Sequence, residues 1–145
     1  MVRLSEYSNS YYHNVSQLRV HDFQKHFVWE PVQLIKKLEQ DENNQKMCVI
    51  LHSEKPCGAF LMKEYALKEY FLWQMIIDKD YQGQGIGKAA IKDMIQKLKN
   101  INAKKVTTTV VKDNEIALKF FQSVGFKKTD EEKDEINLAM DIYYD

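Results

Sequence analysis

Three of the five glycines lie close together in the middle of the chain, in the segment DYQGQGIGK at residues 80–88. A strand-like apolar run, residues 70–77, ends just before this segment, and a periodic helical pattern begins inside it. Glycine permits positive-φ backbone and leaves no Cβ between backbone amides and a ligand. The start of a helix offers free N–H groups and the positive end of its dipole to an anion. The segment is therefore predicted to bind a phosphate group.

Two common phosphate loops do not fit this segment. A P-loop requires a glycine where Gln82 stands and a serine or threonine where Ala89 stands. The dinucleotide fingerprint requires its third glycine where Lys88 stands. The pattern that remains is Gln-x-x-Gly-x-Gly, formed by Gln82, Gly85 and Gly87.

Elements that would position the loop follow it in the sequence. Apolar residues recur every three or four positions from residue 86 to about residue 100, which predicts an amphipathic helix. Residues 106–111 are all β-branched and predict a strand. A strand, a helix and a strand in this order imply a parallel pair with a right-handed crossover. Asp113 or Asn114 would cap a second helix that ends at Gly125.

The first half of the chain predicts an antiparallel meander, because the connections between its strand-like runs are too short for crossovers. The expected strands there are residues 2–7, 47–51, 58–65 and 70–77, with a final hairpin over 126–129 and 136–143. A helix is expected over 31–40, while residues 9–25 read as irregular or helical. The predicted fold class is α/β (α+β), with a mixed central sheet of six to seven strands and about four helices.

The composition indicates an ordinary single globular domain over residues 1–145, with 44% hydrophobic and 29% charged residues. Lysine plus arginine and aspartate plus glutamate both number 21, so no positive excess favours nucleic acid or an anionic membrane. No apolar run approaches the roughly 20 residues that span a bilayer, and the first residues do not resemble a signal peptide. We therefore expect a cytoplasmic, metal-free protein in which Cys48 and Cys57 are reduced thiols.

A second motif follows at residues 113–126, DNEIALKFFQSVGF. Together with the Gln-x-x-Gly-x-Gly loop, it makes the chain resemble the GNAT superfamily of N-acetyltransferases along most of its length. Residues 24–28 and 73–88 are similar in character to bacterial diamine and spermidine acetyltransferases. The resemblance implies a single-domain fold in which two parallel strands splay, and direct acetyl transfer from acetyl-CoA to an amine.

The resemblance also implies which residues bind the co-substrate acetyl-CoA. Backbone groups at 75–77 would pair with the pantetheine arm, and backbone amides at 82–88 would surround the pyrophosphate. The expected contacts are Met75, Ile76, Ile77, Gln82, Gly83, Gln84, Gly85, Ile86, Gly87, Lys88, Asn114, Ala117, Phe120 and Phe121. Simpler roles remain open for several of these residues: core packing for the apolar ones, a solvated charge for Lys88, and helix capping for Asn114.

Phe121 departs from the family pattern. The family usually has tyrosine at this position as the acid that protonates the leaving thiolate, and phenylalanine cannot donate a proton. Water or another hydroxyl would then serve. A module that binds acetyl-CoA with little turnover is the alternative.

The acceptor side is expected to combine acidic and aromatic residues. Glu64 and Glu30 are candidate bases, with Glu69 and His26 as further candidates. The expected substrate contacts are Phe27, Trp29, Glu30, Tyr65 and Trp73. These residue types attract a small cationic amine such as a polyamine through ion pairing and cation–π contact, although each could equally be solvated or packed. Acetylation of a protein N-terminus or lysine is the alternative, and a homodimer is left open.

Overall fold

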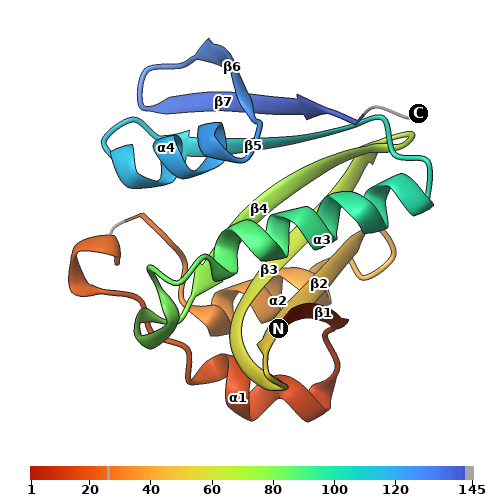
Figure 1. Ribbon diagram of the computed structural model, residues 1–145. Helices are drawn as coiled ribbons and strands as arrows, with labels where there is room; N and C mark the ends of the chain where they lie inside the picture. The colour runs from red at the N-terminus through yellow and green to blue at the C-terminus, as the bar shows by residue number, and fades with distance from the viewer. Residues whose placement is uncertain (26, 143–145) are drawn as a thin grey trace.

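One seven-stranded mixed sheet forms the centre of the molecule in the computed structural model, which describes residues 1–25 and 27–142 (Figure 1). The strands are β1 (Val2–Glu6), β2 (Gln45–His52), β3 (Lys55–Ala66), β4 (Glu69–Ile77), β5 (Lys105–Val111), β6 (Lys127–Glu131) and β7 (Glu135–Asp141). Their spatial order is β1-β2-β3-β4-β5-β7-β6. The predicted fold class, including the meander and the final hairpin, is confirmed.

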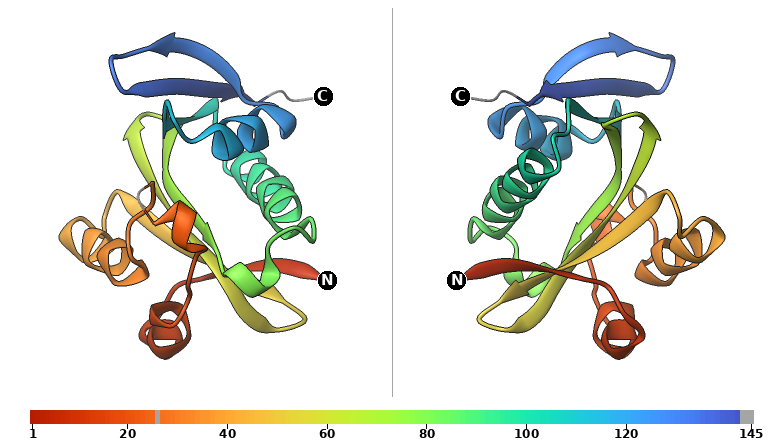
Figure 2. Two further views of the ribbon diagram at one scale, coloured as in Figure 1. Left: turned by 90° about the vertical axis from the view of Figure 1, so that its left-hand side faces the viewer. Right: turned by 90° about the vertical axis from the view of Figure 1, so that its right-hand side faces the viewer.

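Helices cover both faces of this sheet, as Figure 2 shows. The α-helices are α1 (Tyr12–Ser16), α2 (Pro31–Gln40), α3 (Ile86–Asn100) and α4 (Glu115–Ser123), and the 3-10 turns are η1 (Asn9–Tyr11), η2 (Asp22–Gln24) and η3 (Lys79–Tyr81). One core lies between the sheet and α3 with α4, and the other between the sheet and α1 with α2. The sheet therefore divides the hydrophobic core into two clusters, one on each face.

Strands β4 and β5 are parallel neighbours that pair over only part of their length. Their register runs from Glu69 opposite Lys105 to Leu72 opposite Thr108 and ends there. On its other edge, β4 stays paired with β3 as far as Ile77. In Figure 1 the two ribbons diverge beyond the paired region, as the splayed-strand prediction requires. The last residues of β4 thus keep an edge that no strand among the described residues occupies.

The segment between α1 and α2 crosses the open end of this splay, where three backbone contacts fix it. The Arg19 amide donates to Asp78 Oδ1 at 2.8 Å, and the Lys79 amide donates to the Arg19 carbonyl at 2.6 Å. The Trp29 amide donates to Gln74 Oε1 at 2.7 Å. Residues 17–30, apart from residue 26, are called the strap below. No helix among the described residues is long and apolar enough to cross a bilayer.

Candidate functional site

The glycine loop forms an open cradle at the start of α3. Gly83 and Gly85 have φ values of 77° and 79°, a left-handed conformation that other residues rarely adopt. A Cβ added to either glycine would meet no atom within 4 Å. Gly85 is the N-cap of α3, so the free amides of the first turn lie beside the loop. This arrangement fits the diphosphate of a nucleotide cofactor.

Gln82 anchors the loop to two other elements. Its Nε2 donates to the Ile77 carbonyl at 2.8 Å, at the end of β4. The side-chain amides of Gln82 and Gln24 also exchange two hydrogen bonds of 3.0 Å each. The first residue of the loop motif therefore holds the loop, the open strand edge and the strap together.

Gly87 allows helices α3 and α4 to approach each other. A Cβ at this position would lie 3.1 Å from two ring carbons of Phe120 on α4. Helix α4 is itself capped by Asn114, whose Oδ1 accepts from the Ala117 amide at 3.3 Å. The expected cap role of Asn114 is thus present, and its side chain also lies at the cavity described next.

A cavity of about 440 Å³ lies between the glycine loop, the end of β4 and α4. Of the sequence-predicted cofactor residues, it is lined by Met75, Ile77, Gln82, Gly83, Gly85, Ile86, Gly87, Lys88, Asn114, Ala117, Phe120 and Phe121. Ile76 and Gln84 do not line it. The Ile76 side chain is buried in the core on the opposite face, and Gln84 Nε2 donates to the Asp80 carbonyl at 3.1 Å.

Six further residues line this first cavity, and the sequence did not indicate them as contacts. They are Val20, Gln24, Val28, Tyr81, Ile116 and Ser123. The strap residues among them lie in a segment without a regular hydrophobic period, so no sequence signal placed them at the loop. Ile116 lies within the second motif, and its side chain is 63% exposed, which is unusual for isoleucine. The spacing of the motif alone does not predict this exposure.

A second cavity, of about 420 Å³, lies where β4 and β5 have separated. It shares with the first cavity Val28, Met75, Asn114, Ala117 and Phe121, so the two are halves of one groove. Its walls are aromatic, formed by Phe27, Trp29, Phe71 and Trp73. The Trp73 ring lies 5.0 Å from the Phe71 ring and 6.0 Å from the Trp29 ring, centroid to centroid.

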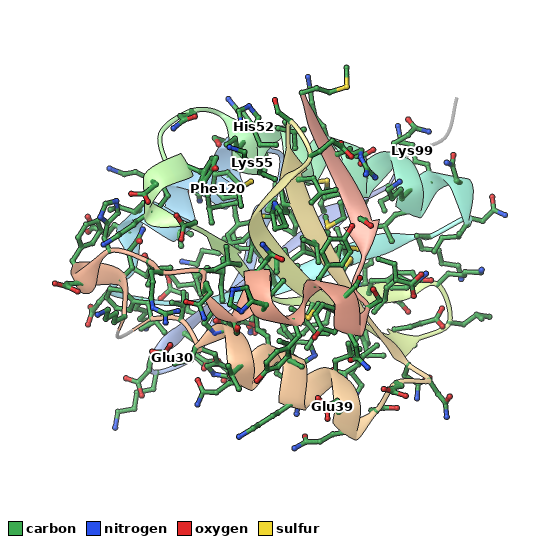
Figure 3. The ribbon with its side chains drawn as sticks, turned by 90° about the horizontal axis from the view of Figure 1, so that it is seen from below. Glu30, Glu39, His52, Lys55, Lys99 and Phe120 are labelled. Atoms are coloured by element: carbon green, nitrogen blue, oxygen red, sulfur yellow. The ribbon has the colours of Figure 1, made fainter. Side chains whose placement is uncertain are left out.

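The structure separates the two predicted bases from this groove. Glu64 lines another cavity, beside Tyr70 and α3, and its Oε2 accepts from the Lys68 amide at 3.1 Å. Glu30 is exposed at the start of α2, where its amide donates to Gln33 Oε1 at 2.7 Å. Figure 3 shows Glu30 near α2, far from Phe120 on the other side of the sheet. Both residues lie close to aromatic residues in the sequence, but closeness in the sequence does not determine on which side of the sheet a side chain lies.

Of the other residues predicted for the acceptor side, some line the second cavity and others do not. Glu69 pairs with Lys105 at 3.3 Å, and residue 26 lies outside the described residues. Phe27, Trp29 and Trp73 line the second cavity, whereas Tyr65 lines an extension of it. The carboxylate that does line the second cavity is Glu135, at the start of β7. Sequence reasoning missed it because β7 reaches the groove only through its pairing with β5.

Phe121 occupies the junction of the two cavities. Its side chain is 8% exposed and contacts the Phe120 and Phe126 rings at centroid distances of 5.2 and 5.3 Å. It offers no proton. The hydroxyls that line the first cavity belong to Tyr81 and Ser123, and Ser123 Oγ already donates to the Phe120 carbonyl at 2.6 Å.

The two cysteines are free in the structure, and neither lines the groove. Burial raises the pKa of both thiols, Cys48 and Cys57, to about 11. Because a thiol rather than a thiolate is a poor nucleophile, these residues do not suit a covalent acyl-enzyme step. The described residues also contain no group of three or more metal-ligating side chains.

Splayed parallel strands, a glycine cradle at a helix start and a groove through the sheet define an acyl-coenzyme A type of site. The sequence pattern of the acetyltransferase (GNAT) family matches residues 9–126, and the chain belongs to this family.

Named relatives agree with this assignment. The chain is 29% identical over 95 residues to the ribosomal protein bS18-alanine N-acetyltransferase of Escherichia coli K12, a match over 59% of this chain and 64% of that relative. The fold is similar to an acetyl-CoA-bound family member from Elizabethkingia anophelis, with TM-score 0.72, 18% identity and 97% of each chain covered. It is also similar to spermidine N-acetyltransferase from Vibrio cholerae in complex with CoA and spermine. That similarity has TM-score 0.78 and 15% identity, and it covers 97% of this chain and 95% of the other.

Proposed function

We propose that this protein transfers the acetyl group of acetyl-CoA to a primary amine. The observation that carries the proposal is the groove between β4 and β5, because a phosphate cradle adjoins its first cavity and an aromatic pocket forms its second. Acetyl-CoA would supply an activated thioester. A groove that reaches both sides of the sheet lets co-substrate and acceptor approach from opposite sides and meet at the junction.

The first cavity would hold the co-substrate. The loop from Gly83 to Gly87 and the α3 N-terminus suit the diphosphate, and Lys88 lies at the same mouth. The unpaired edge of β4 offers backbone groups to the amides of the pantetheine arm. Met75 and Phe120 supply apolar walls for the same arm.

The second cavity would hold the acceptor, for which the sequence favours a small amine such as a polyamine. The incoming amine must lose its proton before attack, and Glu135 is the lining carboxylate able to take it directly or through water. Because Phe121 cannot protonate the departing thiolate, water or the Tyr81 hydroxyl takes that role. The rate should rise with pH as the neutral amine becomes more abundant.

Acetylation of a protein N-terminus is the second candidate. It is supported by the activity of the Escherichia coli relative, which acts on a ribosomal protein alanine. A peptide would need the aromatic cavity to admit an extended chain, whereas a small amine would need only the cavity itself.

The test is CoA release from acetyl-CoA by the whole chain, measured with a thiol reagent and with mass spectrometry of the product. The panel contains diamines, amino acids, aminoglycosides and short peptides with a free N-terminal alanine. Acetylated amine formed in step with CoA is the expected result. Binding of acetyl-CoA without acetylation of any panel member would favour the module with little turnover.

A further inference from the structure

The aromatic cavity continues past Phe71 and Trp73 into an extension of about 570 Å³. The two spaces share these two rings together with Thr108 and Thr109. The charged residues that line the extension are Lys63 from β3 and Lys105 from β5, and no carboxylate among the described residues lines it. The charged side chains that face the far end of the acceptor side are therefore both lysines.

A third lysine, which lines neither space, contacts one of the shared rings. Lys37 Nζ, on α2, lies 4.7 Å from the centroid of the Trp73 ring, and it has no carboxylate partner among the described residues. One face of the Trp73 ring is thus already occupied by a cation of the protein.

Existing ion pairs leave these lysines able to bind an anion. Lys63 Nζ is 4.0 Å from Asp41, at the long limit of an ion pair, and Lys105 Nζ is 3.3 Å from Glu69. The hydrogen bond from Lys105 to Glu69 raises the lysine pKa, so its charge persists at neutral and moderately alkaline pH. Lys105 also lies opposite Asp141 in the β5–β7 register, and the charge of Asp141 acts on it. An ammonium has three donors, so the single carboxylate within 4 Å of each lysine leaves donors for a ligand.

The opposite end of the acceptor space is acidic. Glu135 lines the aromatic cavity, which adjoins the first cavity, and it does not line the basic extension. An amine in the aromatic cavity would find a carboxylate, whereas a second ammonium in the extension would meet two lysines. This order of charges disfavours a polyamine and matches a molecule with a positive and a negative end.

We propose that the acetyl acceptor is a small primary amine that also carries an acidic group, a carboxylate or a phosphate, which Lys63 and Lys105 bind. The proposal rests on the acetyltransferase function above. The amino group lies toward Glu135 and the reaction junction, the carbon chain lies along the Phe71 and Trp73 rings, and the acidic group lies in the extension.

The test uses acceptors matched in chain length: straight-chain diamines, ω-amino acids and aminoalkyl phosphates. The initial rate of CoA release by the whole chain gives kcat/KM for each. Acid-bearing amines should exceed the diamines of equal length by about tenfold or more, because both lysines change from repelling to binding the far group. The carboxylate and phosphate series show which acid the extension prefers.

Variants of the two lysines test whether these side chains cause the preference for acid-bearing amines. Lys63→Gln and Lys105→Gln should raise KM for the acid-bearing amines by about tenfold with little change in kcat, and the reversal Lys63→Glu should improve diamines. Lys97→Gln is the matched control, since Lys97 pairs with Asp93 at 3.9 Å on α3 and lines no part of the groove. Its kinetics should equal those of the unmodified protein.

The outcomes distinguish this proposal from the acetyltransferase function itself. Diamines used as well as acid-bearing amines, or lysine variants that weaken all acceptors equally, would overturn the acidic acceptor while leaving acetyl transfer standing. A requirement for a peptide would overturn the small-molecule part. If no amine in any series is acetylated although the protein binds acetyl-CoA, the acetyltransferase function fails, and the acceptor proposal fails with it.

Discussion

Gln82 shows at the residue scale how a motif position can act through structure rather than through direct ligand contact. Its amide joins the Ile77 carbonyl at the end of β4 and the Gln24 side chain of the strap. All three residues line the first cavity. The glutamine thus fixes the position of the glycine cradle relative to the open strand edge.

Replacing Gln82 by alanine should weaken acetyl-CoA binding by about tenfold, because the loop loses its anchors to β4 and to the strap. Calorimetry of acetyl-CoA binding measures this change, and thermal unfolding should show a loss of about 1–2 kcal/mol. Gln84→Ala is the control: this glutamine is exposed, and its Nε2 donates only to the Asp80 carbonyl. Equal affinities for the two variants would show that the anchor has no influence on binding.

The residues of the glycine loop could be predicted from the sequence because their role depends on local backbone geometry. Gly83 and Gly85 have positive φ values, a conformation that glycine adopts readily, so the positions of these glycines in the sequence already indicate it. Glu135 and Phe71 could not be found in this way. They reach the groove through strand pairing with residues far along the chain, which spacing does not reveal.

At the scale of elements, the site depends on how closely α4 packs against the start of α3. The contact is made by Gly87 and the Phe120 ring, where a Cβ would come within 3.1 Å of two ring carbons. A larger residue at position 87 would therefore force the Phe120 ring to shift by a few tenths of an ångström. The third motif glycine is therefore explained by helix packing as well as by any phosphate contact.

Gly87→Ala should displace the Phe120 ring into the co-substrate cavity and reduce acetyl-CoA affinity by about threefold to tenfold. Phe120→Leu in the same chain should restore part of that affinity, because the smaller side chain leaves room for the added methyl group. Binding measured for both single variants and the double variant gives the coupling, expected at about 0.5–3 kcal/mol. If the losses of affinity in the two single variants simply add in the double variant, the Phe120 ring does not transmit the effect of Gly87→Ala.

The strap was the element that sequence patterns described least. Residues 9–25 showed no clear period, yet the strap supplies Val20 and Gln24 to one cavity and Phe27 and Trp29 to the other. Its position is set by backbone contacts such as the Arg19 amide with Asp78, which depend on tertiary neighbours. By contrast, α3 and the strands around it had strong periods, and their predicted extents match the structure closely.

The whole molecule has no net charge, with 21 basic and 21 acidic residues, so function depends on where charges lie. The sheet places the glycine cradle at one cavity and the lysines near the other, with Phe121 at the junction. Segments far apart in the sequence meet only because β4 and β5 separate after Leu72. The splay is thus the architectural feature on which both binding sides depend.

The most direct test of the acetyl-CoA site compares Gly83→Asp with Gly83→Asn by calorimetry. Aspartate and asparagine tolerate a positive φ better than most residues and differ mainly in charge, and Gly83 has open space beside it. We expect asparagine to keep affinity within about threefold, and aspartate to weaken it by about tenfold or more through repulsion of the diphosphate. Added salt should narrow the difference between them. Equal affinities for the two folded variants at low salt would contradict a diphosphate site in this loop.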